Sequence, residues 1–549
     1  MSKSKIVIIG GVAGGATAAA RLRRLDEHAE IIMFERGGYI SFANCGLPYH
    51  IGGAIEDRED LLLQTPNSFR RRYNVDVRVF SEVTSINREA KTVSVENKQS
   101  GETYIESYDK LILSPGGAPI IPQIDGVTSK RVFTLRSVAD TDRIKEYITK
   151  TRPKSAAVVG GGFIGIEMAE NLREADLNVS IIELSNQVIA PLDIDMACDV
   201  HRHLRQKGVT LYLNNGLQSI TEQNTSLIVK LSNGQLEADM VLLAIGVKPE
   251  SKLAKEIGLD INERGGVIVN KHMLTSDPDI YAVGDVAEVC DFVAGQPAMI
   301  PLAGPANKQA RIAADNICGI PSQYEGTQGS AVIKVFDMTV ASTGVNEKTA
   351  RRAGLDYDKV FLWSPSHAGY YPGAEFMSMK VIFEKGTGRI LGAQIVGYGG
   401  VDKRCDVLAT AIRAGMTAYD LTRLELCYAP PYSSAKDPVN MAGYMIENVL
   451  TGKVKNFHWH DIDGLPRDGS LTLLDVRTPQ EFMHGRIDGF VNIPLDDLRG
   501  RIGELDSAKP TYVHCHSGMR SYIAARILTQ KGFDVYNLSG GYRLYSAVN

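Results

Sequence analysis

The sequence predicts an α/β protein with several domains, because one order of strand, glycine-rich turn, helix and strand occurs twice. A third observation, a further run of short strands and helices near the C-terminus, predicts a separate α/β module there. The first copy consists of the apolar run 5–9, the glycine turn 10–15, an alanine-rich helix 16–24 and a strand 31–34. The second copy consists of the strand 156–159, the turn 160–165, a helix through residue 172 and a strand 179–182.

Length and composition limit the classes of protein that need to be considered. A chain of 549 residues predicts three or four domains. Lys+Arg 60 against Asp+Glu 64 gives a net charge of -4, which predicts no nucleic-acid or membrane partner. No apolar run is long enough to span a bilayer. The seven cysteines are scattered, so we expect a reducing, cytoplasmic location and no disulfide scaffold.

Both glycine turns have the composition of phosphate-binding turns. Backbone N–H groups point outward where a helix begins, and glycine lets a ligand approach them closely. The second turn keeps the three glycines of the G-x-G-x-x-G pattern, whereas the first departs from it with Val12 at the middle position. Each strand that follows ends on an acid, Glu35 or Glu183, which is predicted to bind ribose hydroxyls. Glu183 would repel a 2′-phosphate, and NADH is therefore favoured over NADPH.

A single cysteine follows the first of these units, in the segment Ser41-Phe42-Ala43-Asn44-Cys45-Gly46. The nearest other thiol in the sequence is Cys198, so a local dithiol couple cannot form. Cys45 is therefore predicted to find its sulfur partner on a small thiol, disulfide or persulfide. A helix that begins after Cys45, or an oxidised flavin beside it, would favour the reactive thiolate.

Four segments, GGVAGG (10–15), SFANCG (41–46), GGGFIG (160–165) and YAVGD (281–285), together resemble the pyridine nucleotide-disulfide oxidoreductase family. The segment that contains Cys45 is similar to its single-cysteine branch. The resemblance implies FAD in the first site, NAD(P)H in the second and a homodimer. The cofactor-binding residues that it implies are Gly10, Gly11, Val12, Ala13, Gly14, Glu35, Arg36, Ser41, Asn44, Ser114, Gly116, Gly160, Gly162, Phe163, Ile164, Glu183, Gly246, Gly284, Asp285 and Ala303. No metal site is predicted.

The tyrosine-rich segments 366–373 and 428–433 resemble the coenzyme A-disulfide reductase branch of this family. The resemblance implies that Tyr370 and Tyr428 reach the cysteine of the partner subunit, so that the active site is shared between subunits. A phenol there could protonate a departing CoA thiolate. Coenzyme A also carries phosphates, for which Arg23 is the predicted partner, with Ser41 and Asn44 near the thiol end.

The segment His514-Cys515-His516-Ser517-Gly518-Met519-Arg520 follows a strand and precedes a helix. Successive backbone N–H groups in such a loop can surround an anion or a sulfane sulfur. Together with the segments 474–477, 492–494 and 540–543, it resembles a single rhodanese domain. The resemblance implies a catalytic Cys515 in an anion loop made of Cys515, His516, Ser517, Gly518, Met519 and Arg520.

The complete prediction is an α/β chain with two Rossmann-like domains, an α+β dimerisation domain and a C-terminal α/β rhodanese domain. The expected boundaries are 1–115 and 247–325 for FAD, 116–246 for NADH, 326–450 for dimerisation, 451–457 for a linker and 458–549 for the rhodanese domain. The expected activity is NADH-dependent reduction of CoA disulfide, CoA persulfide or polysulfide. Two alternatives stay open: an NADH oxidase or peroxidase in which Cys45 cycles through sulfenic acid, and a CoA-bound sulfur-carrier or redox-sensing protein.

Overall fold

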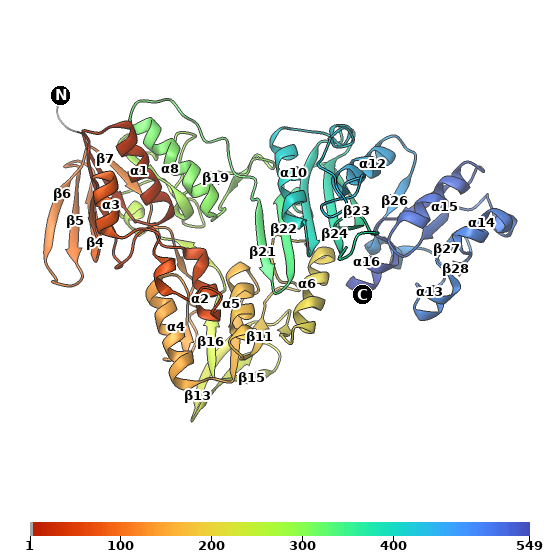
Figure 1. Ribbon diagram of the computed structural model, residues 1–549, viewed down its shortest axis with the longest axis horizontal. Helices are drawn as coiled ribbons and strands as arrows, with labels where there is room; N and C mark the ends of the chain where they lie inside the picture. Colours follow the sequence, from red (N-terminus) through yellow and green to blue (C-terminus); the bar gives the residue numbers. More distant parts are fainter. Residues whose placement is uncertain (1–3) are drawn as a thin grey trace. The chain divides into compact units, whose positions relative to one another are not determined.

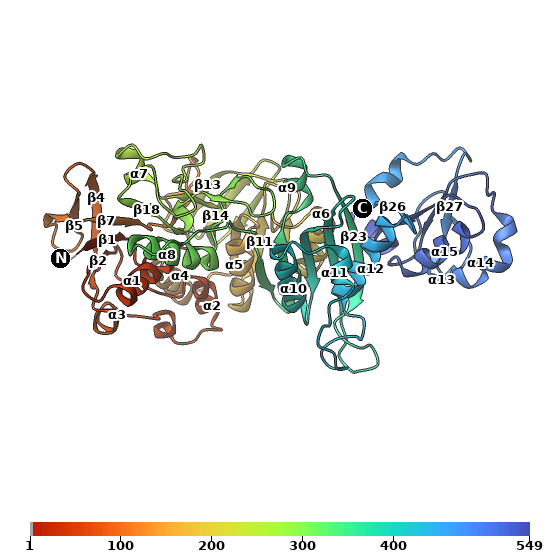
Figure 2. The same ribbon diagram turned by 90° about the horizontal axis from the view of Figure 1, so that it is seen from above.

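A computed structural model describes residues 4–549 (Figures 1 and 2). The chain divides into two compact units, which are described one at a time. The first contains residues 4–188 and 208–329, and the second contains residues 189–207 and 330–549. Within residues 4–549, no helix is both long and apolar enough to cross a membrane.

The first unit contains two parallel five-stranded sheets. The first sheet has the order β18-β7-β1-β2-β3, and helices α1 and α8 pack together beside it (Figure 2). Its strands Ile6 to Ile9 and Ile31 to Phe34 are almost completely buried, as expected for a parallel sheet covered by helices. The elements of this part are β1 (Lys5–Ile9), α1 (Ala13–Leu25), β2 (Glu30–Phe34), η1 (Asn44–Gly46), α2 (Leu47–Gly52), η2 (Arg58–Leu61), α3 (Pro66–Tyr73), β3 (Asp76–Arg78), β4 (Ser81–Asn87), β5 (Thr92–Asn97), β6 (Thr103–Ser107), β7 (Lys110–Leu113), α7 (Lys252–Glu256), β18 (Ile280–Ala282), η3 (Gly284–Val286), β19 (Val289–Cys290), β20 (Pro297–Ala298) and α8 (Ala303–Ile317).

The second sheet of this unit repeats the same local order of elements. Its strand order is β12-β11-β10-β16-β9, and the short antiparallel pair β8–β17 lies where the chain passes between the two sheets. Its elements are β8 (Gly117–Pro119), β9 (Val132–Phe133), α4 (Val138–Thr151), β10 (Ser155–Val159), α5 (Phe163–Glu174), β11 (Asn178–Ile182), β12 (Thr210–Tyr212), β13 (Leu217–Gln223), β14 (Ser226–Leu231), β15 (Gln235–Ala238), β16 (Met240–Leu243) and β17 (Val247–Pro249). The predicted α/β fold with two Rossmann-like sheets is therefore confirmed.

The second unit begins with an antiparallel sheet of order β21-β22-β25-β24-β23 and ends with a parallel sheet of order β26-β30-β29-β27-β28. The elements of the antiparallel part are α6 (Ile194–Gln206), β21 (Ala331–Val335), β22 (Met338–Gly344), α9 (Glu347–Arg352), β23 (Tyr357–Pro365), β24 (Phe376–Glu384), β25 (Ile390–Gly397), α10 (Val401–Arg413), α11 (Ala418–Leu421) and α12 (Pro438–Leu450). Those of the parallel part are β26 (Lys455–Phe457), η4 (Trp459–Gly464), β27 (Thr472–Asp475), α13 (Pro479–His484), β28 (Val491–Asn492), α14 (Leu495–Arg501), η5 (Ile502–Glu504), β29 (Thr511–His514), α15 (Met519–Thr529), β30 (Val535–Leu538) and α16 (Gly541–Val548).

Two segments of this unit differ from the sequence-based expectation. Residues 455–457, expected in a linker, form a strand that pairs with β30, because their backbone groups complete the edge of the C-terminal sheet. Helix α6, expected in the NADH-binding domain, belongs to the second unit. It contacts β25 and α16 and buries several polar side chains, among them Asp195 and Asp199.

Candidate active site

The first glycine turn joins β1 to α1 through a backbone conformation that only glycine adopts readily. Gly10 has a φ of 100°, and a Cβ there would collide with the carbonyl oxygen of Ser114. The N-cap of α1 is Val12, which supplies no side-chain hydrogen bond. The first N–H groups of the helix are therefore left for an anionic ligand.

The second turn has the same construction. Gly160 has a φ of 107°, and a Cβ there would collide with the carbonyl oxygen of Ala244. The N-cap of α5 is Gly162, again without a side-chain hydrogen bond. Nothing lies within 4 Å of the position where a Cβ on Gly162 would stand, so a bound pyrophosphate can approach the backbone closely.

Each glycine turn is held in place by the acid that directly follows the second strand of its strand–turn–helix–strand unit. The Glu35 carboxylate accepts hydrogen bonds from the N–H groups of Gly11 (3.0 Å) and Gly37 (2.8 Å). In the second copy, the Glu183 carboxylate accepts from the N–H groups of Gly161 (2.7 Å) and Ser185 (2.8 Å). Both acids therefore lie at the glycine turn, where a ribose next to the bound pyrophosphate would meet them.

The other predicted cofactor residues lie around the ends of these parallel strands or near them. Ser114 follows β7, and Asp285 lies in the short helix η3 after β18. Arg36 follows Glu35 and pairs with Glu250 at 2.8 Å. Ala303 is the first residue of α8, whose N-cap has no side-chain hydrogen bond. The remaining ones lie in the glycine turns, in the Cys45 segment or at three further glycines with a positive φ: Ala13, Gly14, Ser41, Asn44, Gly116, Phe163, Ile164, Gly246 and Gly284.

Cys45 lies in the short helix η1, directly before α2, and its side chain is exposed and free. Burial of its surroundings raises the pKa of the Cys45 thiol, and the carboxylates of Glu167 and Asp285 raise it further. The sequence suggested that a helix starting after Cys45 would favour the thiolate, but the protein's own groups have the opposite effect. The reason is that α2 has only six residues, whereas desolvation and two nearby carboxylates oppose the anion.

We expect Glu167→Gln to increase the rate at which Cys45 is alkylated at pH 7.5 by about two- to fivefold. Because Glu167 raises the pKa of Cys45, removing its charge lowers that pKa and enlarges the thiolate fraction. The rate should be followed by mass spectrometry of the Cys45 peptide over a range of pH. Glu174→Gln, an exposed position at the end of the same helix, is the matched control, and an equal response there would contradict the assignment.

The second unit brings Tyr370 and Tyr428 together, 58 residues apart in the chain. Their hydroxyl oxygens are 2.9 Å apart, and the two side chains are 76% and 49% exposed. The hydrogen bond with Tyr428 raises the pKa of Tyr370. At neutral pH Tyr370 is therefore a protonated phenol that can donate a hydrogen bond outward.

A buried arginine that the sequence did not single out anchors both tyrosine segments. The Arg404 guanidinium donates to the Ser366 carbonyl (2.9 Å), the Ser433 hydroxyl (3.1 Å) and the Asp437 carboxylate (3.2 Å). Arg404 is 1% exposed. Its fork geometry joins the segment before Tyr370 to the segment after Tyr428, which keeps the phenols paired. An arginine in the first turn of a helix carries no sequence signal for this function.

Arg23 was predicted to bind CoA phosphate, and the structure corrects this prediction. Its side chain is buried, and its guanidinium donates to five backbone carbonyls, those of Asp26, Glu27, Ala29, Tyr73 and Asn74. All its donors are used inside the protein. Arg23 therefore holds the end of α1 against the chain that leads into β3.

The C-terminal loop between β29 and α15 places Cys515 among hydrogen-bond donors. The Gly518 N–H donates to the Cys515 sulfur at 3.1 Å, and the Ser521 hydroxyl donates to it at 3.3 Å. Ser521 lies outside the six predicted loop residues. Gly518 has a φ of 110°, which turns its N–H into the loop. Such donors favour negative charge on the sulfur of Cys515, a residue that is only 1% exposed.

Arg520, one of the six predicted loop residues, is already paired. Its two terminal nitrogens each lie 2.7 Å from an oxygen of Glu481, and the pair lowers the pKa of Glu481 to about 2. Burial lowers the pKa of His516, so this imidazole is neutral at pH 7. Ser517 and the exposed Met519 complete the loop. Its capacity to hold an anion therefore comes mainly from backbone N–H groups.

Comparison with known proteins identifies the class to which these two glycine turns, the single cysteine and the C-terminal loop belong. The chain belongs to the pyridine nucleotide-disulphide oxidoreductase family, whose model matches residues 4–310. The dimerisation domain of that family matches residues 330–438, and a rhodanese-like domain matches residues 459–547. The protein is therefore an oxidoreductase with a dimerisation domain, and FAD and NAD(P)H are its cofactors.

Three relatives show how far the similarity extends. The reduced CoADR-RHD of Bacillus anthracis is 53% identical, with a TM-score of 0.97 over 100% of this chain and 98% of that one. A NAD-dependent persulfide reductase from A. fulgidus is 39% identical, with a TM-score of 0.91 over 98% and 100% of the two chains. The coenzyme A disulfide reductase of Staphylococcus epidermidis is 39% identical over 443 residues, which are 80% of this chain and 99% of that protein.

Proposed function

We propose that the protein reduces the sulfur–sulfur bond of CoA disulfide or CoA persulfide at the expense of NADH. The observation that carries the proposal is the exposed, unpaired Cys45, in the unit that contains both glycine turns. A cysteine without a neighbouring thiol must form its mixed disulfide with the substrate. The names of the similar proteins, a coenzyme A disulfide reductase and a NAD-dependent persulfide reductase, support this substrate class.

The sulfur step follows from thiol–disulfide exchange. The Cys45 thiolate attacks one sulfur of R–S–S–R, forms the bond Cys45–S–S–R and releases R–S⁻. Tyr370 and Tyr428 of the partner subunit would donate a proton to that leaving thiolate, since their paired phenols face outward. When bound, FAD and NADH would supply the two electrons that cleave the Cys45–S–S–R bond, so that Cys45 returns to its thiolate and the second R–S⁻ is released.

The cofactor and substrate contacts belong to the same proposal. Glu35 would hold the ribose of FAD and Glu183 that of NADH, where its charge disfavours a 2′-phosphate. Arg24 replaces Arg23 as the proposed phosphate partner of CoA, because it is the exposed arginine of that helix. Ser41 and Asn44 flank Cys45. The seven free cysteines agree with a reducing, cytoplasmic location.

The test of this function is steady-state NADH oxidation with CoA disulfide, CoA persulfide, polysulfide or oxygen as the acceptor. The proposal requires fast turnover with at least one sulfur acceptor. Oxygen consumption at a comparable rate would instead indicate an NADH oxidase. A stable disulfide between Cys45 and CoA in the purified protein, combined with slow turnover of every acceptor, would indicate a sulfur carrier or redox sensor.

We expect Cys515→Ser to divide the acceptors into two groups. Turnover of free CoA disulfide should stay within about twofold, because that reaction needs only Cys45. Turnover of polysulfide or protein-bound sulfur should fall about tenfold or more, since the fused domain no longer delivers sulfane sulfur at high effective concentration. Loss of CoA disulfide turnover in this variant would contradict the division of labour.

A further inference from the structure

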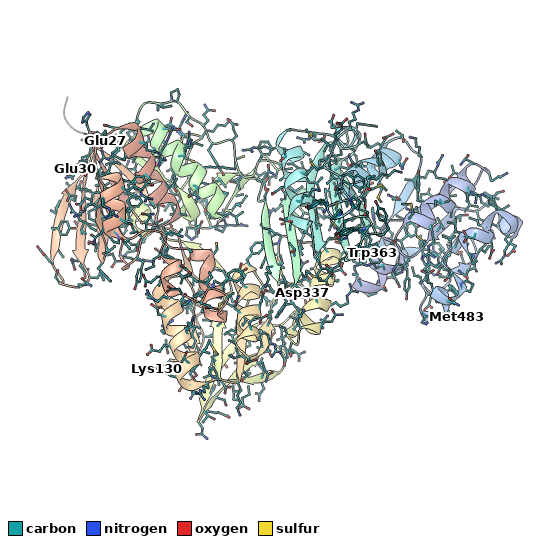
Figure 3. All side chains as sticks on the ribbon, viewed as in Figure 1. Glu27, Glu30, Lys130, Asp337, Trp363 and Met483 are labelled. Atoms are coloured by element: carbon teal, nitrogen blue, oxygen red, sulfur yellow. The ribbon has the colours of Figure 1, made fainter. Side chains whose placement is uncertain are left out.

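A continuous groove runs along α6 within the second unit. It consists of two adjoining cavities of about 640 Å³ and 470 Å³, which have the lining residues Arg202, Gln206 and Ser546 in common. The antiparallel sheet lines the larger cavity, of which Figure 3 labels Trp363 and Asp337, and the end of α16 lines the smaller one. Both volumes are in the range of small-molecule sites. The two cavities together are called the α6 groove below.

The larger cavity has an aromatic wall. The rings of Trp363 and Phe376 are stacked, with centroids 4.0 Å apart. The Trp363 ring also contacts the Arg543 guanidinium, 5.1 Å from its centroid, and the edge of His516 at 5.7 Å. Phe376 has no second ring partner among residues 4–549 and is 47% exposed. The other face of its ring is therefore open to a planar heterocycle, which would stack on it.

A carboxylate next to this ring supplies a hydrogen-bond acceptor. Glu375 directly precedes Phe376, lines the larger cavity and is exposed. Within the described part of the chain it makes no ion pair, whereas Asp337 in the same cavity is balanced by Lys207 at 2.6 Å. An ionised carboxylate only accepts hydrogen bonds. The heterocycle that suits this end is therefore one with an amino group on its edge, as in an aminopurine.

The other end of the groove is basic. Arg202, Arg205 and Gln206 follow one another on α6 at three- and four-residue spacing from Arg202, and they therefore lie on one face of the helix. Asp199, which binds Arg202 at 2.6 Å, also binds Arg543 at 2.8 Å. One carboxylate thus serves two arginines, and the Arg202 side chain stays 53% exposed.

Arg205 is a second unbalanced cation at this end. Its side chain is exposed, and no carboxylate pairs with it among residues 4–549. The C-terminal end of α6 carries roughly half a negative charge, which the two cations outweigh. Two guanidinium groups and the Gln206 amide suit a terminal phosphate, because it has three acceptor oxygens and up to about two negative charges. A carboxylate would leave part of these donors unused.

We propose that the α6 groove binds an aminopurine nucleotide, with its base stacked on Phe376 and its phosphates between Arg202 and Arg205. The groove lies in the second unit, whereas both glycine turns lie in the first, so it is a nucleotide site additional to theirs. A free adenine nucleotide and the adenosine phosphate end of CoA share this chemistry. The proposal goes beyond the reductase function and does not depend on it.

The experiment locates nucleotide binding with a photoreactive probe, 2-azido-ADP. The full-length holoenzyme is illuminated at increasing probe concentrations and digested. Mass spectrometry then follows label on the peptide that contains Phe376 separately from label at the second glycine turn. We expect Phe376→Ala to raise the concentration for half-maximal groove labelling about tenfold, and Arg205→Gln to raise it about fivefold. Labelling at the second glycine turn should stay within about twofold, which also shows that each variant is folded.

The matched control is Arg352→Gln, which removes an exposed arginine from the end of α9, another helix of the second unit, outside the groove. Its labelling should not change. Competition by unlabelled ADP and by CoA identifies the source, because the more effective competitor is the natural ligand; either order supports the proposal. Absence of label from the Phe376 peptide while the glycine turn is labelled would overturn it, as would an equal loss in Arg352→Gln. NADH oxidation with CoA disulfide tests the reductase function separately.

Discussion

Cys45→Ser is expected to lower NADH oxidation with CoA disulfide, CoA persulfide and polysulfide alike, by a factor of at least about 1,000. A serine hydroxyl cannot form a mixed disulfide, so every sulfur acceptor loses the same covalent step. NADH oxidation by the holoenzyme should be followed with each acceptor in turn.

Two comparisons make this result specific. Cys290→Ser, which removes another exposed thiol of the same unit, should leave all rates within about twofold, because no step is assigned to it. The absorbance of bound flavin reports whether each variant retains its cofactor. A Cys45→Ser enzyme with full flavin content and undiminished turnover of a sulfur acceptor would refute the mechanism.

Lys380→Met is expected to destabilise the second unit by about 3–5 kcal/mol, the typical cost of removing one partner of a buried ion pair. The Lys380 ammonium is fully buried and lies 2.9 Å from Asp193, 2.9 Å from Asp195 and 2.5 Å from Glu347. Without it, three carboxylates within 4.8 Å of one another keep only partial compensation. Part of the remaining compensation comes from the ion pair between Lys359 and Glu347 at 2.6 Å.

The same contacts explain the pKa values of the cluster. Coulombic attraction by the three carboxylates raises the pKa of Lys380 despite its burial, and the two lysines lower the pKa of Glu347. A carboxyl whose pKa is lowered by folding contributes stability above its ordinary pKa and loses it as the pH falls. The three carboxylates already hold an ammonium ion among them, so the cluster is a salt-bridge network.

Intrinsic tryptophan fluorescence can measure the destabilisation of the second unit by Lys380→Met selectively. The chain has two tryptophans, Trp363 and Trp459, and both lie in the second unit. Trp459 donates its indole N–H to Asp195 at 3.3 Å, so its emission reports on the cluster. Denaturant unfolding of Lys385→Met, an exposed lysine paired with Asp356, should change the free energy of unfolding by less than about 0.5 kcal/mol. A loss below about 1 kcal/mol in Lys380→Met would contradict the prediction.

Local signals in the sequence were sufficient for the two glycine turns and their acids. The strand Lys5–Ile9 lies where the apolar run predicts it, and Glu35 and Glu183 lie at equivalent positions of the two copies. These features depend on contacts within about 25 residues, so periodicity and turn chemistry reveal them. The family, fold class and cofactors could be predicted for the same reason.

The sequence by itself therefore determined the repeated strand–turn–helix units, the isolated Cys45 and the Cys515 loop, because short-range backbone geometry encodes each of them. Only the tertiary structure decided which charged groups are free. It assigns Arg23 to backbone carbonyls and Arg520 to Glu481, and it places α6 against β25 and α16. Such outcomes depend on desolvation and on partners distant in the chain, which no local pattern of residues records.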